Sequence, residues 1–313
     1  KATRKKAAIP VPVFQAAPDK PVAKAVRKKA EVKEAPAADA PAEEGGGGKI
    51  AMARQGAFST GVAAMMVHPA DADLIRMDSI AVHTVDVTYQ GKAAHAAAAP
   101  WEGRNALDAA VLGYVNVAAL RQHIRPSERI HGIFTEAGEK PNIVPRHAAA
   151  TWYVRSDTIS SLQPLKKRVL ACLEGATSAC GCTMESQWDD HTYADVRDNM
   201  ALVDAYVQNM TALGRQVMDP RVSGHSVVGS TDMGNVSYLL PSIHPMIKMA
   251  PDGVAIHTEE FAHFAGGALG DSAVVTGAQA MAMTVIDLWT KPDLRAQLSS
   301  EFAQVTSDID VLA

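Results

Sequence analysis

Two adjacent carboxylates, Glu43 and Glu44, stand directly before a run of four glycines in the segment PAEEGGGGK. Neighbouring side chains of an extended chain point in different directions, so one carboxylate can ligate a metal while the other acts as a general base. The glycines allow a positive φ and a close approach of the backbone. Such a pair is by itself more often a solvated turn, so the chemical interpretation depends on the rest of the chain.

Three histidines stand where an element is expected to end or begin. His68 closes an apolar segment, His95 follows an expected strand in the segment GKAAH, and His257 precedes an expected helix that Thr258 can cap. Each of them is by itself more often a hydrogen-bonded structural residue than a ligand. The imidazoles of these histidines and the carboxylate of Glu44 are donors that suit zinc, cobalt or manganese.

A further pair of residues fits the recognition of a substrate. Asn142 lies in the segment PNIVP, and Arg155 follows it 13 residues later. The planar guanidinium of an arginine suits a carboxylate, although a lone arginine is more often an ion-pair or surface residue.

Hydrophobic periodicity predicts the elements that must position these residues. Alternation or helical spacing in six consecutive segments gives the order β-α-β-β-α-β, which is typical of a four-stranded sheet with two helices on one face; the segments are 80–89, 104–122, 129–135, 147–155, 158–175 and 182–188. Outside this block we expect short strands at 49–53, 63–67 and 243–249, a helix over 199–213 that ends at Gly214, and a core helix over about 272–290.

Composition narrows the class of protein. The chain has 313 residues, 47% hydrophobic and 20% charged, which is ordinary for a globular protein with room for two domains. The net charge of -4 gives no reason to expect nucleic acid, and no apolar run approaches the roughly 20 residues of a membrane helix. Three cysteines form no disulfide framework, and no signal peptide is visible, so a cytoplasmic location is expected.

Residues 1–42 differ from the rest in composition. They contain ten Lys or Arg residues against four Asp or Glu residues, together with six of the 17 prolines. A solvated linker, or a segment not native to this protein, is the favoured interpretation; a basic tether for nucleic acid is a weaker alternative.

The ordered set of motifs resembles a known family. PAEEGGGGK, MMVHP, GKAAHAAAAPWEGRNALDA, PNIVP, GSTDMGNVS, IHPMI and IHTEEFA are similar to the metal-dependent aminoacylases, glutamate carboxypeptidases and amidohydrolases. Within that family they look most like the β-alanyl-lysine (Xaa-Arg) dipeptidases, with the p-aminobenzoyl-glutamate hydrolases second. The resemblance implies an α/β fold: a zinc-peptidase-like catalytic domain with a mixed sheet and flanking helices, and an inserted βαββαβ dimerisation domain. It divides the chain into a catalytic part (43–78 and 188–313) and this inserted lid domain (79–187).

The resemblance also implies a role for each candidate residue. Glu43 becomes the general base, and His95 reaches the active site of a partner subunit to polarise the scissile carbonyl. Asn142 and Arg155 become the pair that binds the substrate backbone and carboxylate. The implied metal ligands are Glu44, His68 and His257, and we expect their side chains to lie close together. The complete site of this family holds two divalent metals, of which zinc is the first expectation. The implied protein is a homodimeric hydrolase of dipeptides or N-acyl amino acids.

One expected motif has no counterpart in this sequence. The family places a Cys-Gly-His metal motif before its Glu-Glu pair, whereas here no cysteine precedes Cys172 and no histidine precedes His68. The chain thus carries three of about five expected ligands and an incomplete catalytic domain. Two hypotheses follow: a metal-dependent amide hydrolase, or a catalytically dead homologue that acts as a dimerising or binding protein.

Overall fold

The computed structural model describes residues 46–223, 228–304 and 309–312. Glu43, Glu44 and the basic segment 1–42 lie outside the described residues. The lid domain has the predicted order of elements: β4 (Ala81–Gln90), α2 (Ala106–Leu120), β5 (Arg129–Glu136), β6 (His147–Ser156), α3 (Ile159–Cys180) and β7 (Thr183–Trp188). The strand order is β5-β6-β4-β7, every neighbour is antiparallel, and β5 and β7 form the edges.

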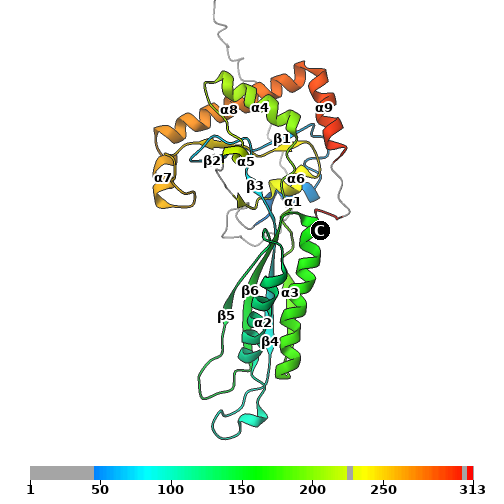
Figure 1. The fold of residues 1–313 in the computed structure, drawn as a ribbon, viewed down its shortest axis with the longest axis vertical. Coiled ribbons are helices and arrows are strands. Elements are labelled where there is room, and N and C mark those ends of the chain that lie inside the picture. The colour runs from blue at the N-terminus through cyan, green and yellow to red at the C-terminus, as the bar shows by residue number, and fades with distance from the viewer. Residues whose placement is uncertain (1–45, 224–227, 305–308, 313) are drawn as a thin grey trace, which may run out of the picture. The chain divides into compact units, whose positions relative to one another are not determined.

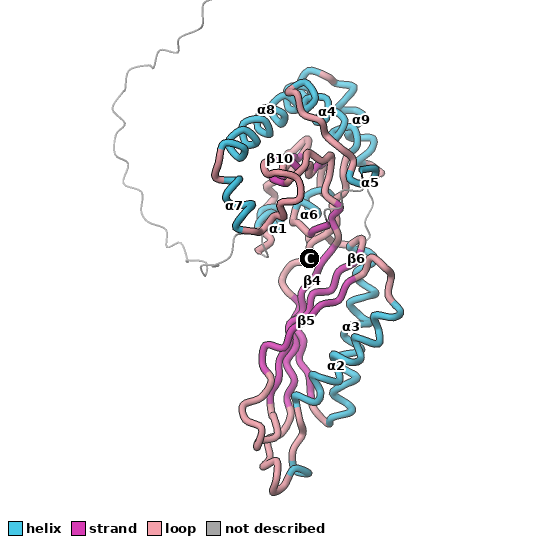
Figure 2. Tube along the Cα trace, turned by 60° about the vertical axis from the view of Figure 1, so that its left-hand side comes forward, coloured by secondary structure: helices cyan, strands magenta, loops and turns pink. Residues whose placement is uncertain are grey.

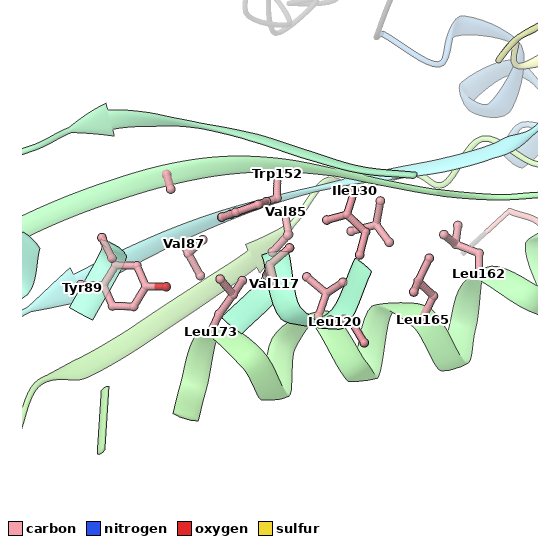
Figure 3. Close-up of a cluster of buried hydrophobic side chains, with 14 of the residues drawn as sticks. Val85, Val87, Tyr89, Val117, Leu120, Ile130, Trp152, Leu162, Leu165 and Leu173 are labelled. Carbon is pink, nitrogen blue, oxygen red and sulfur yellow. The ribbon is translucent and has the colours of Figure 1, made fainter. Parts of the chain in front are cut away.

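Both lid helices cover the same face of this sheet (Figure 1 and Figure 2). Strand β4 alternates strictly, with Val85, Val87 and Tyr89 buried against the helices. Trp152 of β6 fills the centre of this core, and Leu173 of α3 packs opposite Val87 (Figure 3). The alternation and the helical spacing read from the sequence therefore mark the faces that pack together.

The rest of the described chain is an α/β arrangement around short parallel strand pairs. These strands are β1 (Ala64–Met65), β2 (His68–Ala70), β3 (Asp78–Ser79), β8 (Val228–Gly229), β9 (Ser242–Ile243) and β10 (Met246–Lys248), paired as β1-β9, β2-β10 and β3-β8. The helices are α1 (Gly48–Arg54), α4 (Met200–Ala212), α5 (Pro220–Ser223), α6 (Met233–Ser237), α7 (Glu259–Ala265), α8 (Ala268–Thr290) and α9 (Pro292–Phe302). Single 3₁₀ turns cover Pro100–Glu102 and Arg121–His123.

Two of the expected strands are different in the structure. The segment 49–53 belongs to helix α1, which buries Ile50 and Ala53 at the helical spacing of three. The strand expected over 243–249 is two shorter strands, β9 and β10, because His244 and Pro245 interrupt it and proline cannot donate to a ladder.

Helix α8 is also not the core helix that its composition suggests. Only one stripe is buried, while Val274, Ile286 and Trp289 are more than half exposed. Among the described residues, α8 is the one helix that is long and apolar enough to cross a membrane by length and composition. A single helix of this kind is weak evidence for a span, but it corrects the expectation that no segment approaches that length.

Candidate active site

The glycine run enters helix α1 through a left-handed residue. Gly47 has a φ of 57°, and its N–H donates a hydrogen bond to the hydroxyl of Tyr193 at 3.0 Å. A Cβ at this position would lie 2.7 Å from the ring of His191. Gly47 therefore meets both conditions expected of the run, a positive φ and a close approach of the backbone.

A buried carboxylate holds the start of the same helix. Both oxygens of Asp232 are occupied by Lys49: one accepts the backbone N–H at 2.8 Å and the other accepts from Nζ at 2.6 Å. Asp232 belongs to GSTDMGNVS, one of the motifs that carry the family resemblance. Neither residue was a candidate from the sequence, because 183 positions separate them.

His68 lies in strand β2, and a hydrogen bond to the backbone holds its ring. Its Nδ1 lies 2.7 Å from the carbonyl oxygen of Pro69, so Nδ1 donates this hydrogen bond, and in a neutral ring Nε2 carries the lone pair. Metal-binding histidines are commonly held by such a hydrogen bond from the second ring nitrogen. This geometry fits the metal-binding role that the resemblance gives to His68.

A second imidazole, His244, lies beside His68. The ring centroids are 5.6 Å apart, since β2 and β10 run side by side. His244 is 1% exposed, and burial lowers its pKa to about 3. Among the described residues, none forms a hydrogen bond with either of its ring nitrogens. Sequence reasoning assigned it no role, although it stands within the quoted motif IHPMI.

His257 stands at the predicted helix start. Its φ of 62° is the only positive value of a non-glycine residue in the described chain, and Thr258 caps α7 by accepting from the N–H of Phe261 at 3.2 Å. The His257 side chain is exposed. Within residues 46–223, 228–304 and 309–312, no three His, Cys, Asp or Glu side chains form a group that could hold a metal. Because Glu44 lies outside these ranges, the convergence of Glu44, His68 and His257 stays a prediction.

His95 and Asn142 lie together in neighbouring loops at one end of the lid sheet. The carbonyl of Asn142 accepts from the N–H of Ala96 at 3.0 Å, and His95 forms an isolated bridge with Ile143. The Nδ1 atom of His95 accepts from the backbone N–H groups of Ala97 and Ala98 at 3.3 and 3.2 Å. In a neutral ring the proton is therefore on Nε2, which can donate a hydrogen bond. Both side chains are exposed.

Arg155 lies at the opposite end of strand β6. Asn142 precedes that strand, and the eight residue steps from His147 to Arg155 span about 27 Å. The structure therefore does not bring Asn142 and Arg155 together within one chain, although only 13 residues separate them in the sequence. Arg155 lies on the sheet face away from the helices, and its guanidinium carbon is 5.7 Å from the ring centroid of Tyr153.

A groove of about 420 Å³ surrounds Arg155. Its lining also includes Tyr153, His191, Tyr193 and Ser230. Tyr193 and His191 are the residues that contact Gly47. Arg155 and the glycine run therefore lie next to the same groove, and no sequence pattern indicated that they are close.

A buried histidine outside the predicted set, His83, lies at the base of the lid. Its Nδ1 accepts from Nζ of Lys166 at 2.7 Å and from the hydroxyl of Thr192 at 2.9 Å, while Nε2 lies 3.0 Å from the carbonyl of Asp189. Burial lowers the pKa of His83 to about 4. These contacts fix a neutral imidazole that connects α3 to the segment after β7.

Comparisons with known proteins agree with this arrangement. The model of the peptidase dimerisation domain matches residues 81–178. Xaa-Arg dipeptidase of Mus musculus is 40% identical over 262 residues, which cover 84% of this chain and 61% of the relative. A p-aminobenzoyl-glutamate hydrolase subunit from Escherichia coli is 25% identical, and the match covers 85% of this chain and 66% of that protein.

A solved structure shows the same fold. The dinuclear metal-binding peptidase of Bacillus subtilis matches with a TM-score of 0.55 at 16% identity, over 83% of this chain and 64% of that one. The chain therefore contains a peptidase dimerisation domain and is similar in sequence to a dipeptidase and an amide hydrolase. Within that class the chain is a homologue of Xaa-Arg dipeptidase, so the predicted resemblance is confirmed. The chain spans about three fifths of the length of this relative.

Proposed function

We propose that the protein, in its full length, is a metal-dependent hydrolase of the amide bond in dipeptides or N-acyl amino acids. The observation that carries this proposal is His68, whose Nδ1 is held 2.7 Å from a backbone carbonyl so that Nε2 presents its lone pair. The names of the relatives, Xaa-Arg dipeptidase and p-aminobenzoyl-glutamate hydrolase, support the substrate class.

The chemistry of the donor set favours a divalent metal. Imidazole and carboxylate donors suit zinc, and cobalt or manganese as alternatives. His68, His257 and Glu44 would hold it, with two metals in a complete site. When bound, the metal lowers the pKa of a water and polarises the amide carbonyl.

The residues of the chain then carry the proton and orient the substrate. Glu43 takes a proton from the attacking water as the water oxygen bonds to the carbonyl carbon. Glu43 then returns this proton to the amide nitrogen as the C–N bond breaks. The products are a carboxylic acid and an amine. Arg155, in the groove beside the glycine run, binds the substrate carboxylate. His95 donates from Nε2 to the oxyanion that forms on the carbonyl oxygen.

His95 and Asn142 act, in this proposal, on the site of a second subunit. Both lie in loops at one end of β6, about 27 Å of strand away from Arg155 and its groove. One chain therefore cannot bring both ends of β6 to one substrate. A homodimer in which the loops of each lid reach the partner's groove satisfies the geometry.

The proposed contact between the two copies is an apolar surface of α2 and β5. Its exposed members are Val111, Leu112, Tyr114, Val115 and Phe134, while Ile133 points to the other face of the edge strand β5. The surface is continuous, because the rings of Tyr114 and Phe134 lie 6.0 Å apart. Strand β5 is an edge of the lid sheet, which a second β5 can pair in a symmetric dimer.

Metal analysis together with hydrolysis tests the proposal against the catalytically dead alternative. The full-length protein should retain about two metals per chain after dialysis and should hydrolyse dipeptides with a C-terminal arginine or lysine. Chelation should abolish the activity, and zinc should restore it. A dimer that retains no metal and hydrolyses nothing would instead be a dimerising or binding protein.

A further inference from the structure

We propose that Asp86 is a specificity-determining residue, which binds the cationic side chain of the C-terminal residue in the substrate. The inference rests on the proposed function, because it takes Arg155 as the residue that binds the carboxylate of that same residue. A C-terminal lysine or arginine has a negative charge at its carboxylate and a positive charge at the end of its side chain. A groove that selects such a residue needs a cation and an anion at a matching distance.

Asp86 and Arg155 line the same groove of about 420 Å³. The lid helices lie on one face of the sheet, and the groove lies on the other (Figure 2). Strand β4 buries Val85 and Val87 against the helices, so Asp86 between them points to the open face. On β6, Arg155 points to that open face too, because its neighbour Val154 is buried on the helix side.

The register of the two strands sets the spacing of the charges. Arg155 of β6 pairs with Val82 of β4. Thr151 precedes Arg155 by four residues and pairs with Asp86. Four residue steps along a sheet and one step between strands place the Cα atoms of Arg155 and Asp86 about 14 Å apart. The carboxylate and the guanidinium of an extended arginine are about 7 Å apart, and the side chains of Arg155 and Asp86 cover the remaining distance.

The floor of the groove between the two charges suits an aliphatic chain. Tyr153 stands on β6 midway between Thr151 and Arg155, and its ring centroid lies 5.7 Å from the guanidinium carbon of Arg155. The methylene groups of a lysine or arginine side chain can cover such a ring while the charged end extends beyond it.

Asp86 is held in place and has uncharged neighbours. The hydroxyl of Thr151 donates to Oδ1 of Asp86 at 2.5 Å. On the same level of the open face, the register places Ile133 of β5 and Gln187 of β7. These three neighbours carry no charge, so the carboxylate of Asp86 is suited to a cation that the substrate supplies.

The groove has a second acid, Asp189, which provides an internal comparison. Its N–H donates to the carbonyl of Thr84 at 3.1 Å, so Asp189 lies on the β7 side of the sheet, away from β6. Asp189 also lines a second pocket, together with Arg54. A cation of the chain is thus part of the surroundings of Asp189, whereas the row of Asp86 contains none.

Two matched dipeptides test the proposal on the full-length protein. Alanyl-arginine and alanyl-citrulline have nearly the same shape, but only alanyl-arginine has a charged side chain. Asp86→Asn removes the carboxylate charge and keeps the size of the side chain. Glu185→Gln is the control, because Glu185 is an exposed acid opposite Thr88 on the same face of the sheet. The measurement is kcat/KM for both dipeptides, with far-UV circular dichroism to confirm the fold.

We expect the wild type to have the higher kcat/KM for alanyl-arginine. Asp86→Asn should lower this value roughly tenfold and change kcat/KM for alanyl-citrulline less than about twofold, because a hydrogen bond between charged groups is stronger than one to a neutral donor. Glu185→Gln should keep the wild-type ratio. Asp86→Lys reverses the charge, so it should raise kcat/KM for alanyl-glutamate, a gain that misfolding cannot produce.

Two kinds of result would overturn the proposal, and they differ in what they say about the proposed function. A wild-type enzyme that hydrolyses both dipeptides equally well, or a preference for alanyl-arginine that Asp86→Asn keeps and Asp189→Asn abolishes, would refute the role of Asp86 and leave the hydrolase function standing. A full-length protein that hydrolyses neither dipeptide would refute the hydrolase function and this inference with it.

Discussion

Ile133 offers a direct test of the proposed dimer contact. It lies on the edge strand β5 with 68% of its surface exposed, on the sheet face opposite the lid helices. Substitution by lysine places a charge on the strand edge that the proposed dimer pairs with a second β5. In a folded monomer the same charge lies in water, so Ile133→Lys should leave the lid intact.

The magnitude follows from the exposed area. Complete burial of an isoleucine side chain contributes roughly 1.5–3 kcal/mol, so covering the exposed two thirds of Ile133 contributes about 1–2 kcal/mol. A twofold contact counts this contribution twice, which gives about 2–4 kcal/mol, or a dissociation constant raised about 30- to 700-fold. Desolvation of the lysine adds to this loss, so the estimate is a lower bound.

Sedimentation velocity over a dilution series measures the effect. The wild type should be a dimer at micromolar concentration and Ile133→Lys a monomer, with unchanged far-UV circular dichroism. Val274→Lys on α8 is the matched control, because Val274 is 67% exposed but lies outside the lid. A variant Ile133→Lys that dimerises like the wild type, or a wild type that is monomeric, would refute the assignment of this surface.

Three further substitutions test the site and the core. Arg155→Ala should remove a charge-assisted contact worth roughly 1.5–3 kcal/mol, so kcat/KM of the full-length enzyme should fall for substrates with a free carboxylate. Arg155→Lys should restore little of this activity, and kcat/KM for amidated substrates should change little in either variant. Equal damage to both substrate types would assign Arg155 to the fold. Burial lowers the pKa of His83 to about 4, and an unfolded histidine titrates near pH 6.5, so the free energy of unfolding should fall as the pH drops through this window. Urea titrations should show that the free energy of unfolding is roughly 2–3 kcal/mol lower at pH 4.5 than at pH 7, and that this difference is absent in His83→Gln. An equal difference in the variant would show that His83 is not its cause. Gly132→Ala should destabilise by about 1–3 kcal/mol in thermal unfolding, because the new Cβ would lie 2.4 Å from the Trp152 indole; an unchanged Tm would contradict this close packing.

The lid was predictable from the sequence because its signals are local. Strand β4 alternates over ten residues, and α2 and α3 keep their apolar spacing for several turns, so period and length identify each element. Helix α1 is the opposite case. Its four apolar or small residues, 50–53, fit a strand as well as a helix, and the contact that fixes the helix comes from Asp232, 183 positions from Lys49.

The candidate site shows the same limit. His68 could be selected from its own segment, but His244 becomes its neighbour only through the parallel pairing of β2 with β10. Lys49 and Asp232 stand in motifs that were quoted, yet their pairing cannot be read from either motif alone. Spacing along the chain thus identified the residue types, whereas their partners depend on tertiary contacts that a single sequence does not contain.

The separation of Asn142 and Arg155 leads to a test of the dimer that does not depend on its contact surface. The loop before β6 carries Asn142 and the far end of β6 carries Arg155, so in the proposed homodimer each site takes its arginine from one chain and its asparagine from the other. Asn142→Ala and Arg155→Ala homodimers should both be strongly impaired. In a mixed dimer one site carries both defects and the other carries none.

Mixing the two variants under conditions that exchange subunits should therefore restore about a quarter of the wild-type activity, since half of the dimers are mixed and half of their sites are intact. If both residues served the same site from one chain, every site in the mixture would carry a defect and no activity would return. The recovery follows from the length of one rigid strand, because a ten-residue strand cannot bend to bring its two ends to a single dipeptide.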